Sequence, residues 1–299
     1  MKIYPLLVCI LLGITACRTN KTPETDTLQN EITGYLHDKQ ATVGVSVLTD
    51  SCNIVSHNDT VLMPTLSVFK FPLAMAVLHK MNASHTPLDT LVQVSPSDLK
   101  PNTYSPLRDK YPNQKFTIGV DSLLYYSICL SDNNACDILL SYAGGPKAVE
   151  QYIRSLNIKD IYIGVTEDDM HRDPECVYRN SATPAATSLL MKTFLTQKLF
   201  DKEYYEYLYN LLVQTATGTN KLRAGLPEHI TLGHKTGSSD RNPDGMKIAD
   251  NDAGFVLLPD GRRYYITVFV IHSMENDSVN AQIIADISQK VYKHFTAQQ

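Results

Sequence analysis

The stretch AGFVLLPDGRRYYITVFVI, residues 253–271, holds two apolar runs on either side of a turn signal. Pro259, Asp260 and Gly261 are residue types that favour tight turns, and the flanking runs are rich in β-branched and aromatic residues. The stretch therefore predicts a β-hairpin with strands over 253–258 and 264–271. Alternating valines predict another strand over 42–49, and a further one is expected over 231–235.

Helical patterns lie at both ends of the chain. Apolar residues recur at helical spacing over 27–39, and at every fourth position over 278–295. An antiparallel sheet covered by these two terminal helices is the simplest layering of such segments. The predicted fold class is therefore α+β.

The middle of the chain, residues 66–215, shows little alternation. Its apolar spacing indicates an all-helical lobe inserted into a sheet lobe, which comprises 28–65 and 216–299. We expect the two lobes to form a single domain over 28–299, with a ligand site in the cleft between them. The expected helices of the inserted lobe are 67–81, 120–129, 134–142, 146–155, 185–196 and 202–214.

The composition is that of an ordinary globular protein, with 299 residues, a formal charge of −4 and 43% apolar residues. Lys and Arg are spread along the chain, so nucleic acid is not an expected partner. No CxxC pair or histidine cluster suggests a metal site, and no cofactor is expected. The spacing of Cys52, Cys129, Cys136 and Cys176 selects no disulfide pairing, and we expect buried free thiols.

The first 17 residues have the pattern of a secretion signal. Lys2 gives a positive start, and the apolar run over 3–14 is shorter than the roughly 20 residues that span a bilayer. The run ends in Ile14-Thr15-Ala16-Cys17, which resembles a lipoprotein cleavage box. We expect a periplasmic lipoprotein of a Gram-negative bacterium, anchored through Cys17, with 18–27 as a polar tether. The alternative is a soluble periplasmic protein in which Cys17 occurs by chance.

Ser67-Val68-Phe69-Lys70 is the first of four signatures that carry chemistry. A serine hydroxyl is a weak nucleophile until a base takes its proton. Lys70 lies three positions later on the same helical face, and it can act as that base if burial and a second cation lower its pKa. The backbone N–H of Ser67, at a helix start, can face a developing oxyanion. Chance produces on the order of one such pair in a chain of this size, so the signature alone is weak.

Ser131-Asp132-Asn133 lies between two predicted helices. The Ser131 hydroxyl can pass a proton to a leaving nitrogen, and the Asn133 amide can bind a substrate carbonyl. Asp132 is expected to be structural, as the N-cap of the helix that begins near Asn134. Taken alone, the tripeptide is equally consistent with an ordinary helix cap.

Lys235-Thr236-Gly237-Ser238 ends a predicted strand. Lys235 can attract an anionic substrate and lower the pKa of Lys70 across the cleft. The hydroxyls of Thr236 and Ser238 can bind a carboxylate, Gly237 lets a substrate lie close to the strand edge, and the Ser238 N–H can be a second oxyanion donor. A strand end with a glycine turn would also account for the sequence.

These three signatures, in this order and about 64 and 104 residues apart, resemble those of serine β-lactamases and penicillin-binding proteins. The resemblance covers about residues 27 to 296. It implies a five-stranded antiparallel sheet, an acyl-enzyme on Ser67, a β-lactam as the small-molecule substrate, a monomer and no cofactor.

Glu167 distinguishes the two kinds of relative. Both acylate the serine, but only the hydrolase needs a carboxylate to drive water onto the ester. Glu167 lies 13 residues before Asn180, where class A β-lactamases carry their general base. His171 and Asn180 replace the common asparagine and aspartate of this loop, as in the PER and CfxA branch, which implies that His171 positions the water. The alternatives are a solvated acid at Glu167 and an exposed loop histidine.

The partner of the substrate carboxylate is less well defined by the sequence. The arginine that many class A enzymes carry after Lys-Thr-Gly is missing from 250–254. Lys221 matches a position that is often arginine in the PER-like branch, and it is the expected substitute, although one ammonium gives a weaker clamp. Tyr104 matches an aromatic wall of the cleft, and the long connection over 240–250 implies room for bulky cephalosporins. Arg223 is equally consistent with a surface charge, and Tyr104 with simple packing.

The sequence thus predicts a class A serine β-lactamase that confers antibiotic resistance. A D,D-peptidase acting on cell-wall peptides is the first alternative, and it would form a long-lived acyl-enzyme with penicillin. A β-lactam sensor is the second, but it would need a signalling partner or membrane helices.

Overall fold

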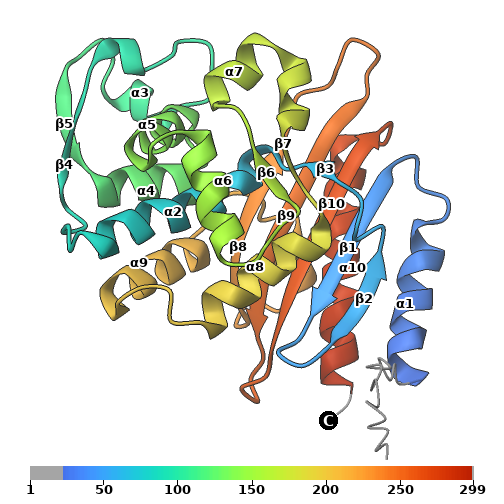
Figure 1. Ribbon diagram of the computed structural model, residues 1–299. Helices are drawn as coiled ribbons and strands as arrows, with labels where there is room; N and C mark the ends of the chain where they lie inside the picture. Colours follow the sequence, from blue (N-terminus) through green and yellow to red (C-terminus); the bar gives the residue numbers. More distant parts are fainter. Residues whose placement is uncertain (1–22, 298–299) are drawn as a thin grey trace, which may run out of the picture.

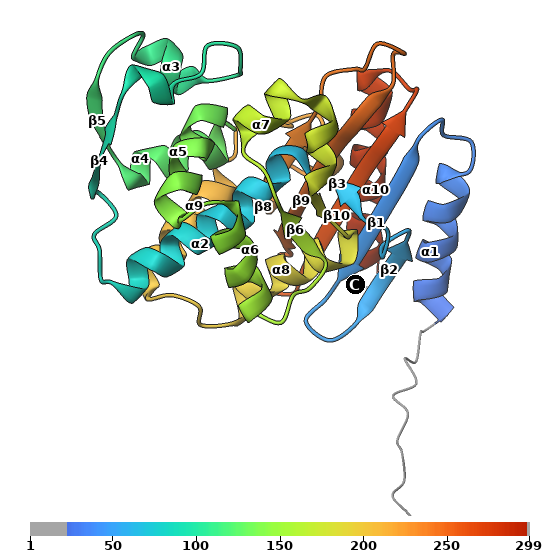
Figure 2. The same ribbon diagram turned by 45° about the horizontal axis from the view of Figure 1, so that its top comes forward.

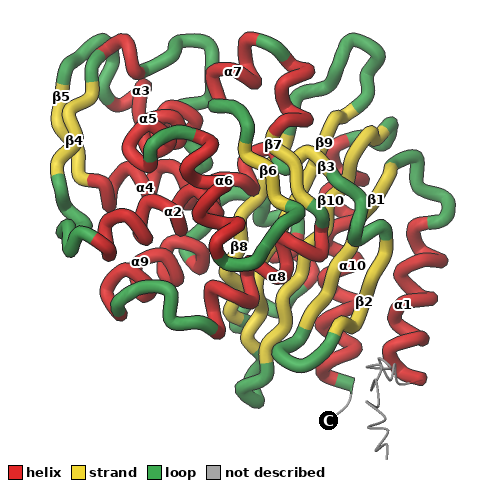
Figure 3. The backbone as a smooth tube through the Cα atoms, viewed as in Figure 1, coloured by secondary structure: helices red, strands yellow, loops and turns green. Residues whose placement is uncertain are grey.

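The computed structural model describes residues 23–297, so the predicted signal, Cys17 and most of the tether lie outside the described residues. Within the described range, no helix is long and apolar enough to cross a membrane. Figure 1 shows two lobes side by side, one built on a sheet and one mainly helical. Figure 3 shows the same division, with strands concentrated in one lobe and helices in the other.

The main sheet has five antiparallel strands in the order β2-β1-β10-β9-β8, as the family resemblance implied. Val45 pairs with Val268 at its centre, and Lys235 pairs with Ala253 near the β8 edge. The predicted hairpin forms as β9 and β10. The bounds are β1 Thr42–Leu48, β2 Asn53–His57, β8 Thr231–Ser238, β9 Lys247–Leu257 and β10 Arg263–Ser273.

Two of these strands differ from the sequence prediction. Strand β2 was not expected, and β9 begins six residues before the predicted start at 253. The first half of β9 is polar, with buried Asp250, Asn251 and Asp252, and therefore lacks an apolar alternation. Each of these residues forms hydrogen bonds with other segments, which makes its burial possible, although the side-chain oxygen of Asn251 has no partner within the described chain.

Helices cover both faces of the main sheet. The terminal helices α1 (Pro23–Leu36) and α10 (Asp277–Thr296) pack on one face, and α8 (Pro184–Thr196) packs on the other against β1, β9 and β10. The predicted stripe of α10 is confirmed, since Ile283, Ile287 and other apolar residues of that helix are buried. One apolar core therefore lies under the terminal helices, and the second extends from the opposite face into the helical lobe.

The inserted lobe is mainly, but not entirely, helical. Each of the six predicted helices is present within three residues of its expected bounds, and 67–81 begins as a 3₁₀ turn over Leu66–Phe69. Two small sheets were not expected, one of two strands and one of three. The helices are α2 Lys70–Ala83, α3 Pro106–Lys110, α4 Val120–Cys129, α5 Asn133–Ala143, α6 Pro146–Ser155, α7 Glu167–Arg172 and α9 Lys202–Val213; the strands are β4 Leu91–Val94, β5 Phe116–Gly119, β3 Met63–Pro64, β6 Ile161–Ile163 and β7 Asn180–Ala182.

The short helix α7 lies beside α5, between the helical lobe and the end of the main sheet (Figure 2). Thr166 caps it: its hydroxyl accepts a hydrogen bond from the Asp169 N–H, and the Asp169 carboxylate accepts one from the Thr166 N–H. This reciprocal cap fixes the start of α7, which the sequence analysis had treated as a loop.

The four cysteines of the described chain are free. Cys129 and Cys136 are buried, as expected, whereas Cys52 is exposed and Cys176 is partly covered.

Candidate active site

Ser67 and Lys70 lie at the junction of the 3₁₀ turn and α2. Ser67 is partly exposed, while Lys70 is fully buried beneath it. The three protons of the Lys70 ammonium have three acceptors: the Ser131 carbonyl at 2.8 Å, the Asn133 side-chain oxygen at 2.6 Å and a Glu167 carboxylate oxygen at 2.9 Å. The Ser67 hydroxyl points to the same Glu167 oxygen, at 3.5 Å.

These contacts reverse the expected pKa shift of Lys70, while the choice between Lys70 and Glu167 as the acylation base was left open by the sequence. Burial disfavours the Lys70 cation, but the adjacent Glu167 carboxylate outweighs burial, so the pKa of Lys70 is raised instead of lowered. Burial, and then the Lys70 ammonium, lower the pKa of Lys235 to about 7. Lys70 thus holds its proton and depresses the pKa of Lys235, which is the reverse of the relationship expected from sequence.

Ser131 connects the two lysines. Its carbonyl accepts a hydrogen bond from Lys70, and its hydroxyl accepts one from the Lys235 ammonium at 3.0 Å. Its φ of 60° is a left-handed conformation that is uncommon for a serine, and it directs the two groups of one residue to two different lysines.

Asp132 is the structural residue that the sequence predicted. It is fully buried and accepts hydrogen bonds from the N–H of Ala135 at 2.8 Å and the N–H of Leu107 at 2.7 Å. The hydroxyl of Ser105 donates to it at 3.0 Å. Asp132 therefore ties the start of α5 to the start of α3 and keeps Ser131 and Asn133 in place.

Glu167 is held in place by Asp137, which the sequence analysis did not single out. The Asp137 carboxylate, on α5, accepts hydrogen bonds from the Glu167 N–H at 2.8 Å and the Asp168 N–H at 2.9 Å. These are unpaired donors at the start of α7, where a negative side chain is favourable. Burial raises the pKa of Asp137 to about 7. The sequence could have indicated Asp137, because it lies four residues after Asn133 and therefore on the same face of α5.

Asn180 closes the loop that carries Glu167. Its buried side-chain oxygen accepts from the N–H groups of Gly164 at 2.9 Å and Val165 at 3.1 Å, and its amide donates to the Val165 carbonyl at 3.1 Å. Its backbone carbonyl accepts from the N–H of Thr65 at 2.9 Å, two residues before the nucleophile. The neutral amide thus joins the two ends of the loop, and the backbone carbonyl of the same residue ties the loop to the Ser67 turn.

Gly237 allows β8, the edge strand of the sheet, to pass close to the Ser67 turn. A Cβ atom at this position would lie 2.5 Å from the Thr65 carbonyl oxygen and 2.9 Å from the Ser67 nitrogen. The glycine therefore permits the approach that brings the backbone of Ser67 and Ser238 to one cavity.

Two adjoining cavities collect most of the predicted site residues. The first, of about 420 Å³, is lined by Ser67, Tyr104, Ser131, Asn133, Lys221, Thr236, Gly237 and Ser238. The second, of about 730 Å³, is lined by Glu167 and His171 and shares Asn133 and Ser238 with the first. Lys70 and Lys235 are buried beside these cavities.

Three peripheral residues differ in how well they fit their expected roles. Tyr104 is 59% exposed at the rim of the first cavity, in agreement with a wall at the cleft mouth. His171 is exposed in the second cavity and forms no hydrogen bond within the described chain, so its role with water remains a prediction. Arg223 donates to the carbonyls of Ile230 and Pro227, and is therefore a structural residue of a turn.

Lys221 is not a free clamp. Lys221 is 6% exposed, and its ammonium forms an ion pair of 2.5 Å with Asp250, a residue that the sequence analysis did not consider as a partner. The expectation that Lys221 is available to a substrate carboxylate is therefore wrong for this state of the protein.

Comparison with known proteins agrees with this geometry. A family profile described as "Beta-lactamase enzyme family" matches residues 26–295. The chain belongs to the β-lactamase family. A β-lactamase of Bacteroides uniformis is 50% identical over 98% of this chain and 97% of its own, and the extended-spectrum β-lactamase PER-1 of Pseudomonas aeruginosa is 34% identical over 95% and 92%. A class A β-lactamase structure from Bacteroides cellulosilyticus superposes with a TM-score of 0.90 at 46% identity, covering 93% of this chain and all of that one.

The relatives and the structural neighbours identify a class A serine β-lactamase. The site differs from the sequence expectation in two features of charge. The β-lactamase keeps Lys70 charged against Glu167, and it pairs Lys221 with Asp250. Both features depend on distances between segments more than 25 residues apart in the chain, which no local pattern shows.

Proposed function

We propose that this β-lactamase hydrolyses cephalosporins and penicillins through an acyl-enzyme on Ser67. The observation that carries the proposal is the position of Glu167, whose carboxylate oxygen lies 3.5 Å from the Ser67 hydroxyl and 2.9 Å from the Lys70 ammonium. A carboxylate at this distance can accept the Ser67 proton directly or through one water.

Acylation begins when Ser67 attacks the lactam carbonyl. Because the pKa of Lys70 is raised and its three protons are engaged, Glu167 is the better acceptor for the Ser67 proton. The backbone N–H groups of Ser67 and Ser238 stabilise the oxyanion. The C–N bond then breaks, and the Ser131 hydroxyl delivers a proton to the lactam nitrogen. Lys235, which donates to that hydroxyl, resupplies the proton.

Deacylation uses the same carboxylate. Before it acts again, Glu167 releases to solvent the proton that it took from Ser67, and Lys235 regains one from solvent. Glu167 then takes a proton from a water molecule as that water attacks the ester carbonyl, and it passes this proton to the Ser67 oxygen as the ester C–O bond breaks. His171 lines the cavity next to Glu167 and is proposed to orient this water.

The second cavity suggests which substrates fit. It lies between the α7 segment and the connection over 239–246, and its roughly 730 Å³ provide room for a bulky acylamino side chain. The similarity to PER-1, an enzyme described as extended-spectrum, supports the same preference. Asn133 lines both cavities, and its amide nitrogen donates to the Thr103 hydroxyl at 2.7 Å; its second amide proton is proposed to bind the carbonyl of that side chain.

Turnover of a chromogenic cephalosporin tests this proposal with two matched variants. Glu167→Gln should convert steady hydrolysis into a single burst. Without the Glu167 carboxylate, Lys70 loses the contact that raises its pKa and can take the Ser67 proton, so the ester still forms, but no carboxylate then activates water to cleave it. Asp168→Asn, which alters the next carboxylate on α7, should stay within about threefold of the native rate, since Asp168 pairs with Arg172 and lines neither cavity. A native protein that itself gives only a burst would favour a D,D-peptidase.

A further inference from the structure

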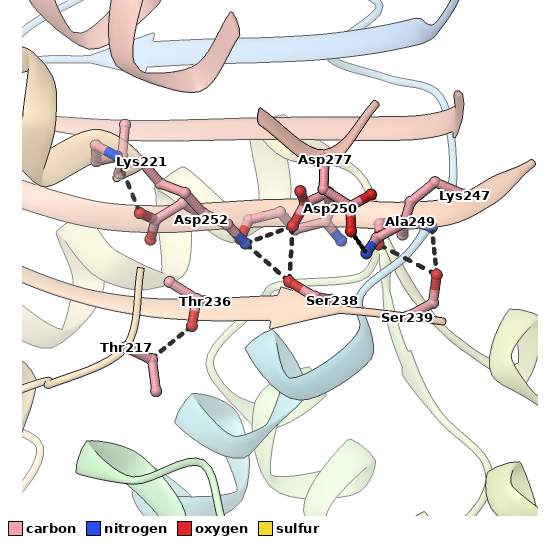
Figure 4. A network of polar contacts seen from close by, with 12 residues as sticks. Thr217, Lys221, Thr236, Ser238, Ser239, Lys247, Ala249, Asp250, Asp252 and Asp277 are labelled. Carbon is pink, nitrogen blue, oxygen red and sulfur yellow. Dashed lines mark hydrogen bonds and ion pairs between the residues drawn. The ribbon is translucent and has the colours of Figure 1, made fainter. Parts of the chain in front are cut away.

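Lys221, Ser238 and Asp250 form a closed triangle of polar contacts at the first cavity, which includes one of the two predicted carboxylate-binding hydroxyls (Figure 4). The Lys221 ammonium contacts Asp250 at 2.5 Å and donates to the Ser238 hydroxyl oxygen at 2.9 Å. The Ser238 hydroxyl in turn donates to Asp250 at 2.6 Å. Each group of the triangle is thus bonded to both of the others.

The triangle is well covered by the protein. The side chains of Lys221 and Asp250 are 7% and 6% exposed, and the third bond of Lys221 goes to the Asn251 carbonyl at 3.2 Å. A buried ion pair with a shared hydroxyl is costly to break, because separation leaves a charge without a partner. An incoming substrate therefore meets Lys221 and Ser238 already engaged.

Strand alternation explains why Asp250 faces this cavity. Asp250 and Asp252 lie two residues apart on β9 and so share one face, towards the segment that carries Lys221. Asp252 is used differently, since it contacts the His234 ring at 2.9 Å and accepts the Leu222 N–H at 3.2 Å. Asp250 is thus the carboxylate of this strand that is matched to Lys221.

We propose that Asp250 is a specificity-determining residue, which withholds Lys221 and Ser238 from the carboxylate of the substrate. The inference rests on the proposed function. With Lys221 neutralised and Ser238 donating to Asp250, the substrate carboxylate is held by the hydroxyl pair Thr217 and Thr236, which lie 2.7 Å apart, and by the Lys235 charge. Asp250 also adds a negative charge close to the bound anion.

The consequence is that the rate constant of acylation depends only weakly on the charge of the substrate. One ammonium without a counter-ion would attract a carboxylate that enters this cavity. Asp250 cancels that attraction. Binding therefore relies on the other parts of the substrate, including its acylamino side chain in the second cavity.

The test compares a chromogenic cephalosporin with its methyl ester, which differ in one carboxylate charge. The quantity measured is the second-order rate constant of acylation, for the native protein and for Asp250→Asn. We expect Asp250→Asn to raise the constant for the acid about five- to tenfold, and that for the ester less than about twofold, because only the acid gains from the freed Lys221. The gain should shrink at high salt.

Two further variants separate charge from structure. Adding Lys221→Ala to Asp250→Asn should remove the gain, since the attracting cation is then absent. Asp277→Asn is the matched control, because Asp277 lines the same cavity but its side chain is 61% exposed and pairs with Arg241 and Lys247. Asp277→Asn should leave the ratio of the acylation rate constants for acid and ester within about twofold of the native ratio.

The outcomes are distinct. Parallel changes for acid and ester, or a loss for the acid alone, would overturn the proposal and leave Asp250 a structural residue of β9. Asp250→Ser supplies a second variant if Asp250→Asn does not fold. Acylation is also measurable when the ester intermediate is stable. If the native protein shows no turnover, the proposed hydrolysis is rejected, but the ratio of the acylation rate constants for acid and ester can still be measured.

Discussion

The Lys70 ammonium lies 2.9 Å from a carboxylate oxygen of Glu167, and both side chains are buried. Burial disfavours the Lys70 cation, but the contact with Glu167 outweighs it and raises the pKa of Lys70, so the lysine keeps its proton. This pair sets the direction of proton transfer in the proposed reaction, from Ser67 towards Glu167.

Loss of one partner should be costly. In Lys70→Ala the Glu167 carboxylate keeps its burial but loses its cation. We expect the free energy of unfolding to fall by about 3 kcal/mol and hydrolysis to fall at least about 100-fold. Urea denaturation and turnover measure the two effects. Lys80→Ala, on the exposed side of the same helix, should change stability by less than about 0.5 kcal/mol, and an unaltered denaturation curve for Lys70→Ala would contradict the role of the pair.

The depressed pKa of Lys235 predicts a pH effect on acylation. Below about pH 7 Lys235 is charged, attracts the substrate anion and donates to Ser131. As the pH rises through this value the charge is lost, and kcat/KM for an anionic β-lactam should decline. Lys235→Arg, whose guanidinium stays charged, should remove this alkaline limb. A profile in which the native enzyme and Lys235→Arg decline at the same pH would assign the limb to another group.

Asp137 should couple stability to pH through its raised pKa of about 7. An acid with a raised pKa binds its proton more tightly in the folded state, so between about pH 4 and pH 7 the folded protein holds more protons than the unfolded chain. Its contribution to stability is therefore present at low pH and is lost as the pH rises through 7. Urea denaturation at pH 5 and pH 8 should show a smaller difference for Asp137→Asn than for the native protein. An equal difference would contradict this assignment.

Gly237→Ala should disturb the approach of β8 to the nucleophile. The added methyl would lie 2.5 Å from the Thr65 oxygen, so the strand must shift away from Ser67. We expect a loss of about 1–3 kcal/mol in stability and a larger fractional loss in acylation. Gly34→Ala is the control, because a Cβ there meets nothing within 4 Å and alanine favours the helix. Native acylation by Gly237→Ala would show that the strand tolerates the methyl group.

We propose, from the sequence Ile14-Thr15-Ala16-Cys17, that the protein is exported and anchored by a lipid on Cys17. In a Gram-negative host, the native protein should incorporate radiolabelled palmitate and sediment with membranes. Cys17→Ser should lose both properties, while Cys52→Ser should keep them. A native protein without label and in the soluble periplasmic fraction would support the alternative of a soluble enzyme.

The sequence predicted the elements whose patterns are local. Helices α4 and α6 have the expected bounds, because no predicted active-site residue interrupts the helical spacing of their apolar residues. The three signatures predicted that Ser67, Ser131 and Lys235 lie together, and the fold does bring them to one place, whereas their catalytic roles stay predictions. The capping role of Asp132 followed from its position before α5.

Features that depend on distant partners were not predictable in this way. The early part of β9 is buried although it is polar, because its side chains bond to other segments. Asp137 and Asp250 are ordinary acids in the sequence, and only the fold brings them to Glu167 and Lys221. The pKa order of Lys70 and Lys235 was reversed for the same reason, since it depends on the contact between Lys70 and Glu167.

The central claim is that Glu167 cleaves the ester formed on Ser67. Its most direct test is the intact mass of Glu167→Gln, quenched seconds after mixing with a cephalosporin, followed by peptide mapping. The account predicts a stoichiometric adduct on the peptide that contains Ser67, persisting for minutes in the variant and absent from the native enzyme at the end of turnover. A variant that remains unmodified, or that turns over at the native rate, would contradict it.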